Sequence, residues 1–181
     1  MYREWKLSKI SEKSSSKTLV ERLLETRGIK EKAQVNEFLN PLETKITHPN
    51  AFVDMKKAVD RISEAIENQE NILVYGDFDA DGVTSTALLL RALRELGASV
   101  DYFIPDREKE GHGLNSKALV KIMAIKKPKL IITCDCASSD VEQVQFINSF
   151  KIDVIITDHH ETPEQLPSAY AIINPKAPNA L

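Results

Sequence analysis

Short apolar segments alternate with segments of helical periodicity along most of the chain. Four apolar runs predict strands, at 72–75 (ILVY), 100–104 (VDYFI), 130–134 (LIITC) and 154–157 (VIIT). Unbroken apolar strands joined by helices are typical of a parallel sheet with helices on both faces and right-handed connections. We therefore expect an α/β fold with a parallel sheet of about five strands, counting AII at 171–173 as the fifth.

Local signals place the helices between these strands. One helix is predicted from about Val83 to Leu96, where Gly97 would end it. A second is expected to begin at Asn115 and to stop before Pro128. The third, 139–150, begins with Ser139 and Glu142 at the spacing of a capping box.

The first 50 residues have a different pattern. Leu19, Val20, Leu23 and Leu24 recur at helical spacing before Gly28, and a second short helix is predicted over 31–39. Pro41 and the polar residues up to Asn50 indicate a linker. A third helix is expected to start at Asp54, as its N-cap. We therefore divide the chain into a helical N-terminal extension with a linker, 1–50, and an α/β domain, 51–181.

Acidic and imidazole side chains follow three of the predicted strands. Asp77, Asp79 and Asp81 come after the first strand, Asp135 follows the third, and 158–160 (Asp-His-His) follows the fourth. The carboxyl ends of parallel strands meet at one edge of a sheet. Carboxylates held close together repel one another unless a cation lies between them. Oxygen ligands favour Mg²⁺ or Mn²⁺ and histidine favours Mn²⁺, so we expect one or two divalent ions there, preferably Mn²⁺.

Each of these signals has a plainer explanation when taken alone. Asp-Gly pairs are common in turns, helix N-termini favour acids, and paired histidines are more often structural than ligating. Three such segments at corresponding strand ends favour a metal site.

A zinc site using Cys134 and Cys136 is disfavoured because we expect the two thiols to point to opposite faces and to stay free. The sequence has neither a phosphate-binding P-loop motif nor the G-x-S-x-G turn of serine hydrolases.

The distribution of charge argues against a protein whose whole surface binds nucleic acid. The net charge is −3, but residues 1–57 carry 12 Lys and Arg against 8 Asp and Glu, which leaves −7 for the remainder. A basic flank beside an acidic centre could hold a polyanion near the metal ions. A solvated helical surface is the simpler explanation for most of those lysines. No apolar run approaches a membrane span of about 20 residues, so no membrane partner and a cytoplasmic location are expected.

Three segments carry a family resemblance. YGDFDADGVTSTALL, TCDC and ITDHHET resemble motifs I, II and III of the DHH phosphoesterase superfamily. The segments IPDREKEGHGLN and INPK are most similar to its RecJ branch, the single-strand-specific 5′ to 3′ exonucleases. The resemblance covers about residues 50–176. It implies metal-dependent hydrolysis of phosphodiesters in single-stranded DNA, with a single-strand-binding protein or a helicase as further partners.

The resemblance also assigns roles by position. It implies that Asp79, Asp81 and His159 are metal ligands and that Asp135 bridges the two metals. Asp158 would orient its neighbours or contact metal directly, and His160 would touch the scissile phosphate. Asp77 is typical of RecJ-like motif I and is a further candidate metal residue. Arg107 and His112 lie in the loop after 100–104, at the same edge of the sheet, and are candidate phosphate contacts; the alternative is a solvated loop.

Departures from the family pattern leave other functions open. Tyr75 stands where many superfamily members have a histidine ligand, and Ala137 where a glycine is usual. RecJ-like proteins continue into a fourth motif with another aspartate ligand and then a second domain, so we expect the DHH domain here to be C-terminally incomplete and its activity alone to be low. The alternatives are a phosphodiesterase for short oligonucleotides or cyclic dinucleotides, and a non-catalytic module that binds nucleic acid or protein.

Overall fold

The computed structural model describes residues 18–41 and 46–181. The chain divides into two compact units, Met1–Thr47 and His48–Leu181, each described separately below. The interpretation of residues 1–17 as part of a basic flank, and of 42–45 as linker, lies outside the described residues. Over the described residues no helix is both long enough and apolar enough to cross a membrane.

The first unit contains the two predicted short helices, α1 (Leu19–Thr26) and α2 (Lys32–Leu39). Thr18 caps α1, because its hydroxyl accepts from the amide of Glu21, whose carboxylate accepts in turn from the amide of Thr18. Gly28 has a φ of +81°, the left-handed conformation that ends helices. Leu24 alone among the predicted apolar positions of α1 is buried.

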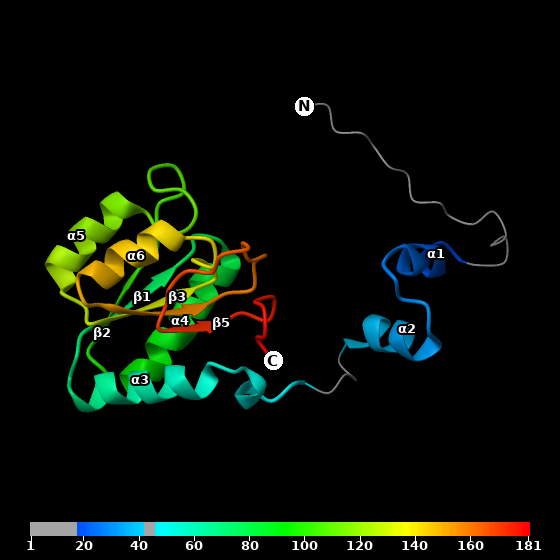
Figure 1. The fold of residues 1–181 in the computed structure, drawn as a ribbon, viewed down its shortest axis with the longest axis horizontal. Helices are drawn as coiled ribbons and strands as arrows, with labels where there is room; N and C mark the ends of the chain where they lie inside the picture. Colours follow the sequence, from blue (N-terminus) through cyan, green and yellow to red (C-terminus); the bar gives the residue numbers. More distant parts are fainter. Residues whose placement is uncertain (1–17, 42–45) are drawn as a thin grey trace. The chain divides into compact units, whose positions relative to one another are not determined.

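The second unit is a five-stranded parallel sheet with helices on both faces, as predicted (Figure 1). Its strands lie in the order β2 (Val100–Phe103), β1 (Ile72–Gly76), β3 (Leu130–Cys134), β4 (Asp153–Thr157) and β5 (Ala171–Ile173). All four strand pairs are parallel. The strand order changes direction between β1 and β3, which is where open α/β sheets bind ligands.

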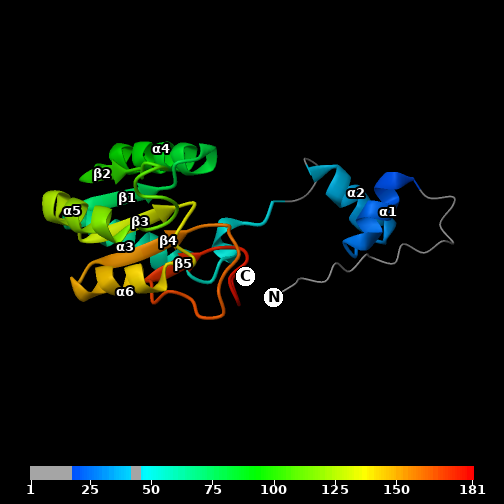
Figure 2. The same cartoon turned by 90° about the horizontal axis from the view of Figure 1, so that it is seen from above.

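Alternate residues of each strand supply two separate cores. The helices α3 (Met55–Glu67) and α4 (Ala80–Glu95) cover one face, whereas α5 (Ser116–Lys126) and α6 (Val141–Ser149) cover the other (Figures 1 and 2). Ile72 and Val74 pack with residues of α3 and α4, and Leu73 and Tyr75 pack with residues of α5 and α6. This two-sided burial is the reason that the strands read as unbroken apolar runs.

Two predicted helix starts are wrong. Helix α4 begins at Ala80, three residues earlier than predicted, because the Asp79 carboxylate caps it. The capping box proposed for Ser139 and Glu142 does not form, since α6 starts at Val141 after Asp140.

The helix α3 is tied to the sheet at its start and at its middle. Asp54 occupies its predicted N-cap position, but the carboxylate instead accepts a hydrogen bond from the amide of Ile172 in β5. Arg61, which is 7% exposed, pairs with Glu70 and with Asp153, both at 2.7 Å. A short 3₁₀ helix, η2 (Pro49–Ala51), precedes α3.

Candidate metal centre

The register of the sheet aligns the strand ends that carry the predicted ligands. Gly76 pairs with Cys134, and Cys134 pairs with Thr157. The next residue after each of these is acidic: Asp77, Asp135 or Asp158. Three carboxylates therefore leave three adjacent strands at the same level of the sheet.

The first acidic turn is held tightly by its backbone. One oxygen of Asp79 accepts from the amides of Asp81 and Gly82, at 2.9 and 3.0 Å. The bond from Gly82 is the main cause of a pKa for Asp79 below its ordinary value. A Cβ at Gly82 would lie 2.3 Å from the carbonyl oxygen of Asp77, so only glycine fits there. The close turn explains the Asp-Ala-Asp-Gly sequence.

Asp135 is a buried carboxylate whose polar neighbours are two histidines and another acid. Its side chain is 5% exposed, and its oxygens accept no well-aligned hydrogen bond from the described residues, although Nε2 of His159 lies 2.9 Å from Oδ1. Burial, followed by the negative charge of Asp79, raises the pKa of Asp135. Its backbone φ is +64°, a conformation that non-glycine residues adopt mainly at functional or strained positions. A cation would neutralise the charge of this buried carboxylate.

Asp158 has the opposite environment, because its oxygens are already used. One oxygen accepts from the amides of His159 and His160 and lies 2.8 Å from Nδ1 of His160. The other accepts from the amide of Ser138 at 3.1 Å. Burial raises the pKa of Asp158, but these hydrogen bonds outweigh it and leave the pKa below its ordinary value. The arrangement favours the orienting role over direct metal contact.

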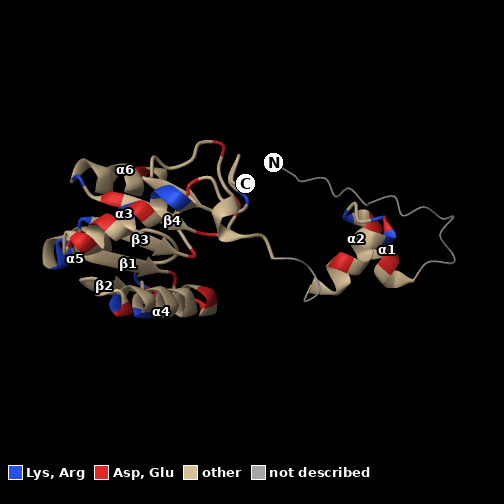
Figure 3. Ribbon diagram, turned by 90° about the horizontal axis from the view of Figure 1, so that it is seen from below, with Lys and Arg blue, Asp and Glu red and all other residues tan. Residues whose placement is uncertain are grey.

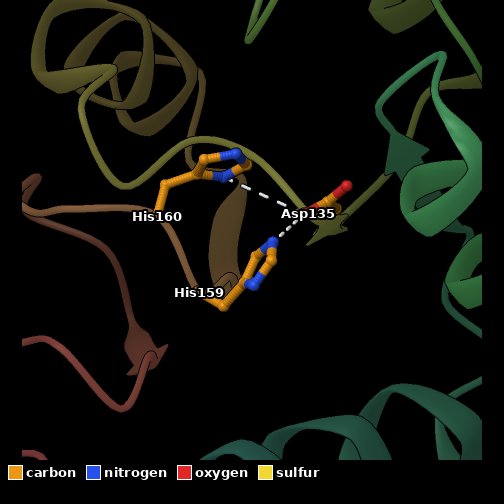
Figure 4. Close-up of side chains that lie close together, drawn as sticks. All are labelled: Asp135, His159 and His160. Atoms are coloured by element: carbon orange, nitrogen blue, oxygen red, sulfur yellow. Dashed lines mark ion pairs between the residues drawn. The ribbon is translucent and has the colours of Figure 1, made fainter. Parts of the chain in front are cut away.

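The two histidines that follow Asp158 turn toward Asp135 (Figure 4). Nε2 of His159 lies 2.9 Å from Oδ1 of Asp135, and Nδ1 of His160 lies 3.9 Å from the same oxygen. The bond to Asp158 raises the pKa of His160. It also fixes the Nδ1 edge of that ring, so the Nε2 edge remains for a ligand.

Potential ligand atoms form two groups that share one residue. Within each group the atoms lie within 4.8 Å of one another: Asp77, Asp79 and Asp135 in the first, and Asp135, His159 and His160 in the second. Asp135 is common to both. This geometry fits the bridging role that the family resemblance assigns to it.

The structure does not bring Asp81 into either group of described residues. Asp81 lies in the first turn of α4 and lines an open hollow of about 600 Å³, together with Asp135 and His159. A second hollow, of about 380 Å³, is bordered by Asp77, Asp135 and His160 among others. Asp135 and Asp158 line both hollows.

The other predicted phosphate contacts also lie at this edge. Nδ1 of His112 is 3.5 Å from Oδ1 of Asp77, which has no hydrogen bond within the described part of the chain. The His112 ring stacks on Phe78, with centroids 4.3 Å apart, and the guanidinium of Arg107 lies 5.3 Å from the same ring. Phe78 was not predicted as a site residue, although its place between Asp77 and Asp79 could have indicated it.

Asn174 is another residue that the strand-end pattern missed. It is fully buried, and its side-chain amide donates to the hydroxyl of Ser138 and to the carbonyl oxygen of His160. It therefore fixes the backbone of the Asp-His-His segment. Asn174 lies in the INPK segment, which contributes to the family resemblance. The sequence pattern gave no indication that its side chain contacts the Asp-His-His segment.

The departures noted in the sequence have structural explanations. Tyr75 is fully buried, and its hydroxyl contacts the 113–115 backbone and supplies no metal ligand. Ala137 has a φ of +82°, which glycine adopts more readily. Cys134 and Cys136 are free, buried thiols in opposite cores, because the left-handed turn at Asp135 separates them. They lie outside both ligand groups.

Comparisons with known proteins agree with this geometry. The model of the DHH family, N-terminal domain, matches residues 71–180. The single-stranded-DNA-specific exonuclease RecJ of Bacillus subtilis is 42% identical over 173 residues, which is 96% of this chain and 22% of that protein. RecJ of Haemophilus influenzae is 41% identical over 163 residues, 89% of this chain and 27% of its own length. The chain thus spans about a quarter of the length of these relatives.

Solved structures give the same result. A crystal structure of exonuclease RecJ bound to manganese has a TM-score of 0.66 and 32% identity, over 72% of this chain and 33% of that one. RecJ from Thermus thermophilus, in complex with Mn²⁺, has a TM-score of 0.60 and 29% identity, over 86% and 21% of the two chains. Together with the family match and the aligned motifs at the three strand ends, these similarities show that the chain belongs to the DHH family.

Proposed function

We propose that this chain provides the metal centre of a 5′ to 3′ exonuclease that degrades single-stranded DNA using two divalent ions, Mn²⁺ by preference or Mg²⁺. The observation that carries the proposal is Asp135, a buried carboxylate that accepts no well-aligned hydrogen bond from the described residues and belongs to both ligand groups. A single cation or a pair would neutralise the charges that otherwise repel one another there.

The residues fit a metal pair in their chemistry. Asp77, Asp79 and Asp135 offer oxygens for one ion, and Asp135 with His159 offers oxygen and nitrogen for the other. When bound, such ions supply Lewis acidity toward water and toward phosphoryl oxygens. Asp81 remains a proposed ligand on the basis of the family resemblance. Asp158 is proposed to act on the metal site by orienting the two histidines.

His160 is proposed to contact the scissile phosphate. Asp158 holds its Nδ1, while Nε2 has no hydrogen bond to the described residues. The ring is therefore fixed in orientation but has one nitrogen free for substrate. A donor fixed in advance stabilises developing charge without a cost of reorientation during the reaction.

The choice of single-stranded DNA rests on the relatives, which are named for that substrate and are about four times longer than the matched segment. The charges of this chain alone do not favour DNA, because acidic residues gather at the carboxyl edge of the sheet and in the first turn of α4 (Figure 3). We therefore propose that this chain binds the phosphate groups of DNA only when metal cations are bound. A single-strand-binding protein or helicase partner and a cytoplasmic location belong to the same proposal.

A non-catalytic binding module is the second candidate. Tyr75 favours it. This residue occupies the position of a histidine ligand in many superfamily members, but its phenol is buried and supplies no ligand, so a metal could lack one of its usual contacts. The shared position of Asp135 favours catalysis, because a simple binding surface has no need for a strained, buried carboxylate.

Digestion of labelled strands tests the proposal. The protein, supplied with Mn²⁺, is expected to release the label of 5′-labelled single strands on a mononucleotide, to shorten 3′-labelled single strands stepwise, and to leave blunt duplexes intact. EDTA should stop the reaction. If the 181 residues are part of a protein as long as its relatives, they should act more slowly alone, because substrate positioning contributes much of the rate. Preferred cleavage of dinucleotides would contradict the proposal and favour the short-substrate phosphodiesterase; binding without cleavage in the longer protein would favour the module.

A further inference from the structure

The loop that joins β2 to α5, residues 105–115, borders the metal centre. It brings His112 next to Asp77 and places Arg107 and His112 on Phe78, which lies between two of the acidic residues. Its outer part is braced within itself, since Asp106 accepts from Lys109 and its amide donates to Glu110. The position of the loop relative to the sheet, however, depends on its last residues.

Tyr75 hydrogen-bonds to two of those residues from the adjacent strand end. Its hydroxyl donates to the carbonyl oxygen of Gly113 and accepts from the amide of Asn115, both at 3.2 Å. The side chain is fully buried in β1, and burial raises its pKa, so the phenol keeps its proton. Both hydrogen-bonding functions of this buried hydroxyl are therefore used on the loop backbone.

Asp140 holds the residue between them. It precedes α6 as the N-cap, a position where aspartate normally bonds to its own helix, but its side chain caps nothing there. Instead, Oδ2 accepts from the amide of Leu114 at 2.7 Å. A Cβ at Gly113 would lie 2.7 Å from that same oxygen, and Gly113 has a φ of +73°. The carboxylate and the glycine thus fit each other closely.

We propose that Tyr75 and Asp140 are positioning residues that clamp residues 113–115 and thereby hold Arg107 and His112 at the metal centre for contact with substrate phosphates. The inference rests on the proposed function for its substrate. Neither residue belongs to a ligand group, so the clamp is expected to act mainly on substrate binding. It also gives Tyr75 a role that suits a phenol, because one oxygen donates and accepts there, whereas a neutral imidazole uses two separate nitrogens.

The test compares Tyr75→Phe and Asp140→Ala with two matched variants. Asp140→Asn keeps an oxygen that can accept from Leu114, and Tyr170→Phe removes a phenol hydroxyl away from the loop. Hydrogen exchange is measured at the amides of Leu114 and Asn115, and affinity is measured with a labelled, phosphorothioate-linked single strand in Mn²⁺. We expect faster exchange and about threefold to tenfold weaker strand binding in Tyr75→Phe and Asp140→Ala, with KM raised and kcat nearly unchanged. The melting shift in Mn²⁺ should stay at the reference value, and Asp140→Asn and Tyr170→Phe should behave as the reference protein.

A double-mutant cycle separates the clamp from a general loss of stability. Adding Tyr75→Phe to a variant that carries both Arg107→Ala and His112→Ala should weaken strand binding no further, because the clamp acts through those two side chains. Unchanged exchange at residues 114 and 115, or additive losses in the cycle, would overturn the inference. If the reference protein neither binds nor cleaves single strands, the proposed function fails together with the substrate role of the clamp; the exchange rates then still decide whether the clamp itself exists.

Discussion

Replacing Asp135 with asparagine is expected to abolish the thermal stabilisation that Mn²⁺ gives the protein and, at the same time, to make the metal-free protein more stable. In the reference protein, metal at about 100 times its dissociation constant should raise the melting temperature by roughly 5–10 °C. The variant should lose that shift, because Asp135 belongs to both ligand groups. The metal-free gain follows from removing a buried carboxylate whose pKa is raised by burial and by Asp79.

The pH dependence of the metal-free protein has a defined sign. Because the folded chain holds the Asp135 proton more tightly than the unfolded chain does, the free energy of unfolding should fall as the pH rises from the ordinary value of 3.8 through the raised pKa. Asp135→Asn should flatten this part of the curve. Thermal melts between about pH 4 and 8, with EDTA or Mn²⁺, measure both effects.

Asp153→Asn is the matched control. It removes a carboxylate that pairs with the buried Arg61, away from the metal centre. We expect it to lower the stability of the metal-free protein and to keep the full shift in Mn²⁺. A normal Mn²⁺ shift in Asp135→Asn would show that the metal binds elsewhere or not at all.

Replacing His160 with asparagine is expected to lower kcat for single-strand hydrolysis by about 10²–10³-fold, the usual cost of losing one donor to a developing charge. Metal binding should be largely kept, because the Nδ1 of His160 is committed to Asp158 and its distance to Asp135 is 3.9 Å. His159→Asn gives the contrast, since the Nε2 of His159 lies 2.9 Å from Asp135.

The two histidine variants are compared by calorimetric Mn²⁺ titration and by initial rates at saturating metal. In His159→Asn the affinity for Mn²⁺ should fall, and part of the lost rate should return at high metal. If His160→Asn lost metal affinity as severely as His159→Asn, His160 would be a ligand and its assignment to the phosphate would be wrong.

The sequence predicted the sheet and the place of the site because both depend on strong, regular signals. The unbroken apolar runs reflect burial on two faces, and parallel register brings the residues after Gly76, Cys134 and Thr157 to one edge. The predicted cluster of Asp77, Asp79, Asp135 and the two histidines follows from that register.

What the sequence could not predict depends on backbone conformation and side-chain direction. The left-handed φ of Asp135, a residue that both ligand groups share, has no signal in the local sequence pattern. Nothing in the local pattern indicated that Asp140 would bond to Leu114 across the fold in place of capping its own helix. Helix α4 starts earlier than predicted because the carboxylate of Asp79 caps the helix and also belongs to a ligand group.

Calorimetric titration with Mn²⁺ tests most directly the claim that Asp135 joins two metal sites. The account predicts that the reference protein binds two equivalents of Mn²⁺ and that Asp135→Ala binds none. Asp77→Ala should bind one, because Asp135 and His159 remain. A single equivalent in the reference protein, or equal losses in the two variants, would contradict it.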